Sequence, residues 1–330
     1  MMASAKILAL VLCIAIALGI ILFGSAVHND WLFRVTTLTM LAASWNLMAN
    51  AGLVSLGHSA FWGVGSYATV LSMNSFNLPF GLGFIPAIIV GALLGAFLAA
   101  ATGRLRGIFF AISTLALSEG LRVLALMVPE VTGGAAGLFL KNDLRPPQWL
   151  LYGSGLFGAI LCVGIAYLLS RSRFHYACRG MRSNESVVQM LGVDPRRYRM
   201  GVMVISGAMA SCAGAINAIY GGYLEPELAF SLHFTILAQI APILGGIHTL
   251  AGPVVGAVAI VFISEITRVW LGTREGWSLL IYGGVLVVCI LFMRQGILGA
   301  WRSLVKRADD WRGGKRRDLV PGDPAVGSVP

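Results

Sequence analysis

Long apolar segments recur along the whole sequence, and each is about as long as a helix that crosses a lipid bilayer. Such a helix needs about 20 mostly apolar residues. Hydrophobic residues make up 57% of the chain and charged residues only 12%, which excludes a soluble globular domain. The sequence therefore predicts an all-α, polytopic membrane protein with about ten transmembrane helices. The predicted spans are residues 7–27, 31–50, 52–73, 82–102, 108–128, 153–170, 201–221, 233–248, 250–270 and 278–293.

Three of these segments admit a second interpretation. The third and eighth are rich in glycine or interrupted by proline, so each could be re-entrant rather than fully spanning. The first could be a signal peptide, but its apolar run from Ile7 to Phe23 is long for one. The cleavage sequence Gly24-Ser25-Ala26 is also only a loose match, so we expect a retained first span.

The positive charge of the chain follows the predicted topology. The formal net charge is +10, and 18 of the 24 Lys and Arg residues fall between spans on one side of a ten-span arrangement. Cytoplasmic loops of membrane proteins carry an excess of Lys and Arg. We therefore expect both termini in the cytoplasm, contact with membrane lipid and no nucleic-acid partner.

The sequence divides into a membrane domain, residues 1–308, and a tail, residues 309–330. The tail is charged and then rich in Gly and Pro, so we expect it to be disordered. No GxxxxGK[ST] motif occurs, and no segment is left for a nucleotide-binding fold. Isolated cysteines and histidines provide neither a metal cluster nor a catalytic one. We expect no enzyme activity and no cofactor, and any ATP that powers the chain must bind to another protein.

A basic loop between two spans, residues 171–199, holds seven arginines and one predicted helix. The helix runs from Asn184 to Leu191, about 12 Å. Glu185 suits the positive end of its dipole, and Gly192 suits a left-handed C-terminal cap. Two interpretations stay open: a helix that docks on a partner protein, or a loop that lies on lipid headgroups. The candidate docking residues are Arg179, Arg182, Asn184, Glu185, Val187, Val188, Leu191 and Gly192.

Small and polar residues inside the spans, or in the outer loop near residue 132, form a second candidate set. Small residues permit close helix packing, and they also permit unwound backbone that lines a cavity. Among the polar groups, His58 and Tyr67 are best suited to face a pathway, although His58 is predicted near the cytoplasmic end. The candidate pathway residues are Asn46, Gly52, Gly57, His58, Gly63, Gly65, Tyr67, Thr132, Gly133 and Gly134.

Two predicted spans contain short segments of similar sequence, residues 118–123 and 264–269. Each places a Glu and an Arg three residues apart on one helix face, so we expect the ion pairs Glu119–Arg122 and Glu265–Arg268. Charged groups at this depth are expected to face the bundle interior or a cavity. This similarity could reflect either a weak internal repeat or chance. Paired carboxylates argue against a secondary transporter driven by an ion gradient, which remains the alternative function.

Six motifs in order resemble the permease subunits of branched-chain amino acid ABC importers, in particular their M-type. The likeness runs from about Leu38 to Arg294. It includes Asn46 with the segment 52–61, the turn at 104–107, the SEGLR segment at 118–122, Thr132 to Leu138, the loop helix, and the glycine-rich turn near residue 250. No single motif is specific, whereas their order and spacing are.

The resemblance implies a bacterial inner-membrane importer. A second, H-type permease would complete the pathway, two cytoplasmic ATPase subunits would bind ATP, and an extracytoplasmic binding protein would deliver the substrate. The loop helix would be the coupling helix that sits on an ATPase. The chain departs from the family at Ala135-Ala136 and Ile247-His248. Branched-chain or related small amino acids are therefore the expected substrates, with amides, urea and aromatic amino acids left open.

Overall fold

The computed structural model describes residues 24–103, 105–271 and 296–300, together with the single positions 19, 21, 280, 283, 284 and 287. Within these residues, eight of the ten predicted spans coincide with long helices. The first and tenth predicted spans and the predicted tail lie almost wholly outside the described residues. The long helices are α2 Ala26–Asn50, α3 His58–Phe76, α4 Phe84–Ala101, α5 Ile108–Met127, α7 Gln148–Ser170, α10 Pro195–Gly221, α12 Leu232–Gly246 and α13 Gly252–Leu271.

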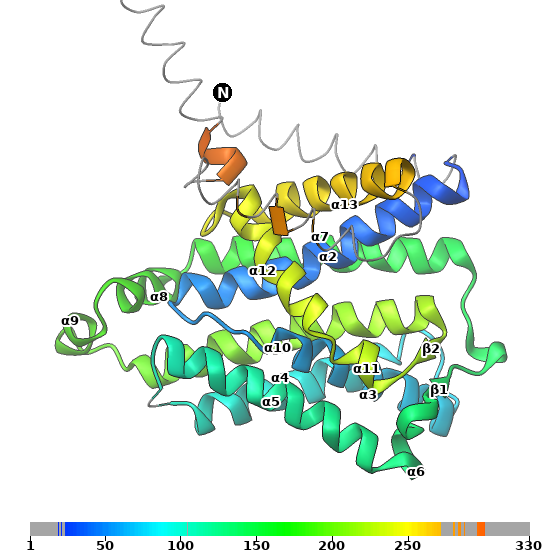
Figure 1. The fold of residues 1–330 in the computed structure, drawn as a ribbon. Helices are drawn as coiled ribbons and strands as arrows, with labels where there is room; N and C mark the ends of the chain where they lie inside the picture. The colour runs from blue at the N-terminus through cyan, green and yellow to red at the C-terminus, as the bar shows by residue number, and fades with distance from the viewer. Residues whose placement is uncertain are drawn as a thin grey trace, which may run out of the picture.

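Short elements cap the two ends of this helical bundle. At one end, α8 and α9 project beyond the long helices, and at the other end lie α6, β1 and β2 (Figure 1). The two strands pair antiparallel, with Leu138 opposite Leu224. The short elements are α6 Pro129–Thr132, η1 Gly134–Ala136, β1 Leu138–Phe139, η2 Asn142–Leu144, α8 Arg173–Ser183, α9 Glu185–Met190, β2 Tyr223–Leu224 and α11 Pro226–Ala229.

Helix α10 forms the centre of the bundle. Its apolar stretch is 72% buried, against 28% for α4 and α5 and 22% for α7. Small residues allow α3 and α4 to approach it closely: a Cβ on Gly65 would lie 2.2 Å from the Ser211 carbonyl oxygen. Five segments of the described chain are long and apolar enough to cross a membrane, namely α4, α5, α7, α10 and residues 226–246. The prediction of an all-α, multi-pass membrane protein is confirmed.

The third predicted span is interrupted at its start, whereas the eighth is a continuous helix that passes through Pro242. Residues 51–57 are unwound before α3 begins at His58, and the short α11 precedes α12. The starts of α3 and α12 meet, because the Ser59 amide donates to Thr235 Oγ1 at 2.9 Å. Thr235 Oγ1 also donates to Ser59 Oγ at 2.9 Å, and Ser118 Oγ of α5 lies 2.8 Å from Ser59 Oγ. These side chains satisfy backbone groups that an interrupted helix leaves free inside a membrane.

Candidate functional site

The loop helix predicted in the basic segment is present as α9. Asn184 is its N-cap, and the Asn184 side-chain oxygen accepts hydrogen bonds from the Ser186 and Val187 amides at 3.1 and 3.3 Å. This oxygen satisfies N–H groups that the first turn of a helix cannot pair internally. Gly192 follows the helix with φ +82°, a left-handed conformation that glycine adopts without steric cost. The predicted start and stop of this helix are confirmed.

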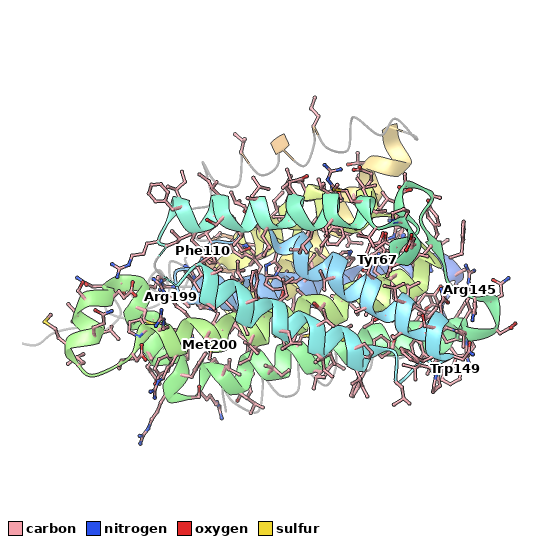
Figure 2. The ribbon with its side chains drawn as sticks, turned by 90° about the horizontal axis from the view of Figure 1, so that it is seen from below. Tyr67, Phe110, Arg145, Trp149, Arg199 and Met200 are labelled. Atoms are coloured by element: carbon pink, nitrogen blue, oxygen red, sulfur yellow. The ribbon has the colours of Figure 1, made fainter. Side chains whose placement is uncertain are left out.

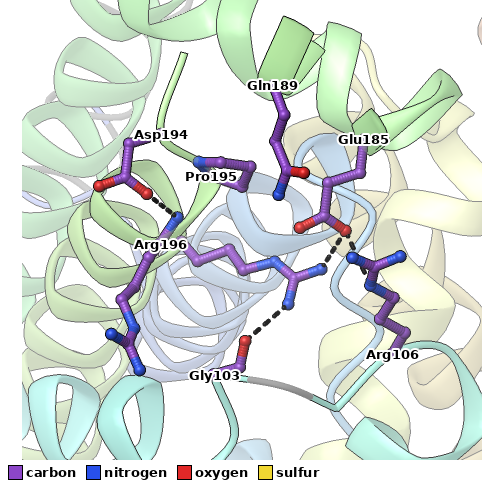
Figure 3. A pocket seen from close by; sticks show the side chains of 8 residues that line it. Gly103, Arg106, Glu185, Gln189, Asp194, Pro195 and Arg196 are labelled. Carbon is purple, nitrogen blue, oxygen red and sulfur yellow. Dashed lines mark hydrogen bonds and ion pairs between the residues drawn. The ribbon is translucent and has the colours of Figure 1, made fainter. Parts of the chain in front are cut away.

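Glu185 ties α9 to the rest of the chain (Figure 3). Its Oε2 accepts from Arg199 Nη2 at 2.8 Å and forms an ion pair with Arg106 Nε at 3.0 Å. The side chains of Glu185 and Arg199 are only 13% and 11% exposed. Arg199 Nη1 also donates to the carbonyls of Gly103 and Leu105 at 3.4 and 3.3 Å. We call Glu185, Arg106 and Arg199 the α9 clamp, because they join α9 to α10 and to the α4–α5 turn.

The two faces of α9 differ in what they contact. Val188 is buried, and its Cγ2 would lie 2.8 Å from a Cβ on Gly180 of α8. Val187, Met190 and Leu191 are instead 45%, 79% and 76% exposed. The apolar surface that faces away from the bundle is therefore formed by these three residues. Val188 and Glu185 were also candidate docking residues; their side chains contact α8 and the arginines of the α9 clamp, and their role in docking stays a prediction.

The α12–α13 turn lies at the same end as α9 and is held by Asn46. The Asn46 Nδ2 donates to the Thr249 carbonyl at 3.0 Å, and its Oδ1 accepts from the His248 amide at 3.0 Å. His248 has φ +64°, an uncommon conformation for a residue with a Cβ. Asn46 was a candidate for the pathway; the structure shows that it braces this turn, and its place on a pathway stays a prediction.

Arg182 lies beside this turn and beside the α2–α3 connection. A Cβ on Gly52, where φ is +78°, would lie 3.3 Å from the Arg182 Cα. Burial, together with the nearby Arg182 and Arg179 guanidinium groups, lowers the pKa of His248 to about 4. His248 is therefore uncharged at neutral pH, and Gly52 belongs to this end of the molecule.

The glycines of α3 and its preceding loop are sites of close packing. A Cβ on Gly57 would lie 1.8 Å from the Thr114 carbonyl oxygen, and one on Gly63 would lie 2.5 Å from the Phe230 ring. His58 is fully buried, with Nε2 2.7 Å from Ser44 Oγ. These contacts support the packing interpretation, and a role of these residues in a pathway stays a prediction.

Tyr67 is also buried. Its ring stacks on Phe230 with ring centroids 5.9 Å apart. Figure 2 shows Tyr67 among the helices, well away from Arg199 and Phe110 at the α9 end. Phe230 lies in the connection between α11 and α12, and a role of Tyr67 in a pathway stays a prediction as well.

The outer-loop residues of the second candidate set shape a turn. Thr132 Oγ1 donates to the carbonyls of Ala125 and Val128, which end α5. Gly133 and Gly134 have φ +74° and +53° and lead into η1 and β1. Nothing in this geometry assigns them a ligand, so their proposed place on a pathway is still untested.

One predicted intrahelical ion pair is confirmed and extended. Arg122 Nε lies 2.8 Å from Glu119 Oε2, and Arg122 Nη1 lies 2.6 Å from Glu227 Oε1 on α11. Glu119 and Glu227 are 49% and 60% exposed, so Glu119 does not face the interior of this chain, and the other alternative, that it faces a cavity, stays a prediction. Sequence reasoning missed Glu227, because a contact between residues 105 positions apart leaves no local pattern. Glu265 is buried, and the side chain of its predicted partner Arg268 lies outside the described residues.

Comparison with known proteins shows which family the chain belongs to. Residues 28–290 match the family described as branched-chain amino acid transport system, permease component. The match covers most of the chain, so the chain belongs to this family. The chain is a transport permease rather than an enzyme, and the predicted family is confirmed.

Individual relatives agree with the family match. The chain is 28% identical to the high-affinity branched-chain amino acid transport system permease protein LivM of Escherichia coli, over 82% of this chain and 71% of LivM. It is also 28% identical to the autoinducer 2 import system permease protein LsrC of an Enterobacter strain, over 86% and 87% of the two chains. A solved structure, PsaBC from Streptococcus pneumoniae in complex with Fab, shares the fold with a TM-score of 0.52 and 13% identity, over 85% and 96%.

Proposed function

We propose that this chain forms part of the translocation pathway of an importer and receives energy from separate ATPase subunits through α9. The observation that carries the proposal is the two-sided character of this helix. Its outward face is exposed and apolar at Val187, Met190 and Leu191, whereas its inward face is fixed by Glu185. An exposed apolar patch beside charged residues is typical of a protein–protein contact. The family membership favours this function over a transporter driven by an ion gradient.

The α9 clamp gives the proposed motion a route into the bundle. A partner that moves α9 also pulls on Arg199 of α10 and, through Arg106 and the Gly103 carbonyl, on the α4–α5 turn. Ion pairs and hydrogen bonds of this kind can transmit a displacement only while they stay intact. We therefore propose that Glu185 acts within the chain, and that the exposed apolar residues make the contact with the ATPase.

The remaining partners and the location follow from the family and from charge. We propose a second permease subunit, two cytoplasmic ATPases that bind the ATP, and an extracytoplasmic binding protein, in a bacterial inner membrane. Arg106, the arginines of α8 and those at the start of α10 lie at one end of the bundle, which supports a cytoplasmic position for that end and for both termini. The relatives are named for branched-chain amino acids and for autoinducer 2, and we propose branched-chain or related small amino acids here.

Reconstitution tests this proposal. The chain would be incorporated into liposomes with its neighbouring permease and ATPase gene products and a binding protein loaded with radiolabelled leucine. We expect uptake that requires ATP and that continues when proton and sodium gradients are abolished by ionophores. Uptake that follows an ion gradient and ignores ATP would support the alternative function and overturn this one.

A further inference from the structure

A pocket of about 250 Å³ lies beside the α9 clamp, at the end of the bundle where α8 and α9 project (Figure 3). Its walls come from α9, from the start of α10 and from the turn between α4 and α5. The volume is below the range of about 300–1,000 Å³ that is usual for drug-sized ligands, so the pocket suits a smaller group. The charged residues that line it are Arg106, Arg196, Arg199, Glu185 and Asp194.

On one side of the pocket, two arginines share a single carboxylate. Both Arg106 and Arg199 pair with the same oxygen, Glu185 Oε2. Arg106 makes this pair through Nε, and its side chain is 61% exposed. A guanidinium group has five N–H donors, so the terminal nitrogens of Arg106 remain available to a ligand.

On the other side, Arg196 has no carboxylate partner among the described residues. Its Nε lies 3.8 Å from the position of a Cβ on Gly103, in the α4–α5 turn. The neighbouring Asp194 caps α10 and pairs with Arg197, with Oδ2 3.3 Å from Arg197 Nε. Arg106 and Arg196 approach the pocket from opposite sides in Figure 3. The pocket therefore carries an excess of positive charge that a bound anion can balance.

Exposed apolar side chains border this charged pocket. Ile108 and Phe109, at the start of α5, are each 68% exposed, and Met200 of α10 is 47% exposed. Figure 2 shows Met200 next to Arg199 at this end of the bundle. Helices α5 and α10 are long and apolar enough to cross a membrane, so the pocket lies at the level where two spans reach the headgroup region.

We propose that this pocket binds a phosphate group, with Arg106 and Arg196 as its ligands. Guanidinium groups bind phosphate strongly through paired N–H donors. Basic pockets between spans at the cytoplasmic face bind the headgroups of anionic lipids, and inorganic phosphate offers the same chemistry. The bound phosphate joins the α4–α5 turn to α10, which are the two elements that Glu185 ties to α9. The binding requires this chain alone and does not depend on the proposed function.

Native mass spectrometry tests the proposal on the purified full-length chain, released from nanodiscs with equal amounts of phosphatidylglycerol and phosphatidylcholine. We expect preferential retention of phosphatidylglycerol, because choline cancels the phosphate charge in phosphatidylcholine. Arg106→Gln and Arg196→Gln should each weaken this retention roughly tenfold, since each removes a charged hydrogen-bond donor. Arg171→Gln is the matched control. It removes the same charge at the same end of the molecule, but Arg171 lies over the Tyr167 ring and does not line the pocket.

A second measurement identifies the source of the phosphate group. Displacement of phosphatidylglycerol by millimolar inorganic phosphate would assign the pocket to free phosphate, and retention despite it would assign the pocket to the lipid. The comparison of the two lipids on the unaltered chain needs no variant to fold. Equal retention of both lipids, with no effect of inorganic phosphate on the melting temperature, would overturn the proposal. An equal loss of phosphatidylglycerol from Arg171→Gln would also overturn it, because general surface charge would then explain the binding.

Discussion

Removal of the negative charge at Glu185 should separate ATP hydrolysis from transport. The Glu185–Arg199 pair is nearly buried, and loss of one partner of a buried pair costs about 3–5 kcal/mol. The Arg106 side chain is 61% exposed, so its pair with Glu185 adds about 1 kcal/mol or less. Arg199 keeps its two carbonyl contacts after Glu185→Gln. We therefore expect the attachment of α9 to weaken by about 2–3 kcal/mol, roughly 30- to 150-fold.

The assay for this prediction is uptake per ATP hydrolysed in reconstituted liposomes. Glu185→Gln should lower that ratio by about tenfold or more, because a detached α9 moves without α10. Asp194→Asn is the matched control. It removes a carboxylate from the pocket that Glu185 also lines (Figure 3), yet asparagine caps α10 as well as aspartate does. The Asp194 pair with Arg197, 86% exposed, contributes little. Normal uptake per ATP in Glu185→Gln, with assembly of the complex intact, would refute the reasoning.

Three further predictions concern the backbone, the packing and the pH response. Gly192→Ala should lower coupled uptake, because alanine at φ +82° is disfavoured by about 1–2 kcal/mol. Unchanged uptake would show that the Gly192 cap of α9 is not needed for coupling. Gly65→Ala should lower the melting temperature in detergent, since its Cβ would lie 2.2 Å from the Ser211 carbonyl oxygen, whereas Gly153→Ala, with open space around it, should not. His248 has a folded-state pKa of about 4, below its unfolded value of 6.5, so the stability that it contributes above pH 6.5 should be lost as the pH falls toward 4. His248→Asn should flatten the dependence of the melting temperature on pH over that interval, and an unchanged slope would contradict the assignment.

The spans and the α9 helix could be predicted from the sequence, because both depend on local patterns of residues. Eight predicted spans coincide with helices, since a long apolar run specifies a membrane helix with little help from tertiary contacts. Asn184, Glu185 and Gly192 mark the start and stop of α9 in the same local way. The interruption at residues 51–57 was also visible, as glycine inside an apolar segment, whereas Pro242 does not interrupt α12.

The directions of individual side chains could not be read from the sequence. Val188 and Val187 are adjacent and chemically identical, yet one packs on α8 and the other is exposed. Glu185 fitted a simple dipole argument, and its two arginine partners lie 14 and 79 positions away along the chain. A cavity between α2, α3, α10, α12 and α13 is lined by residues of five helices, so no spacing in the sequence predicts it.

The central claim is that energy enters this chain at the outward face of α9. Single cysteines would be placed at Leu191, at Met190 or at the buried Val188, in a chain whose native cysteines are replaced by alanine, and crosslinked in membranes that contain the whole transporter. We predict that Leu191→Cys and Met190→Cys crosslink to an ATPase subunit in a manner that depends on ATP, whereas Val188→Cys does not. Crosslinks from all three positions to lipid alone would show that α9 lies on the membrane surface and would contradict the account.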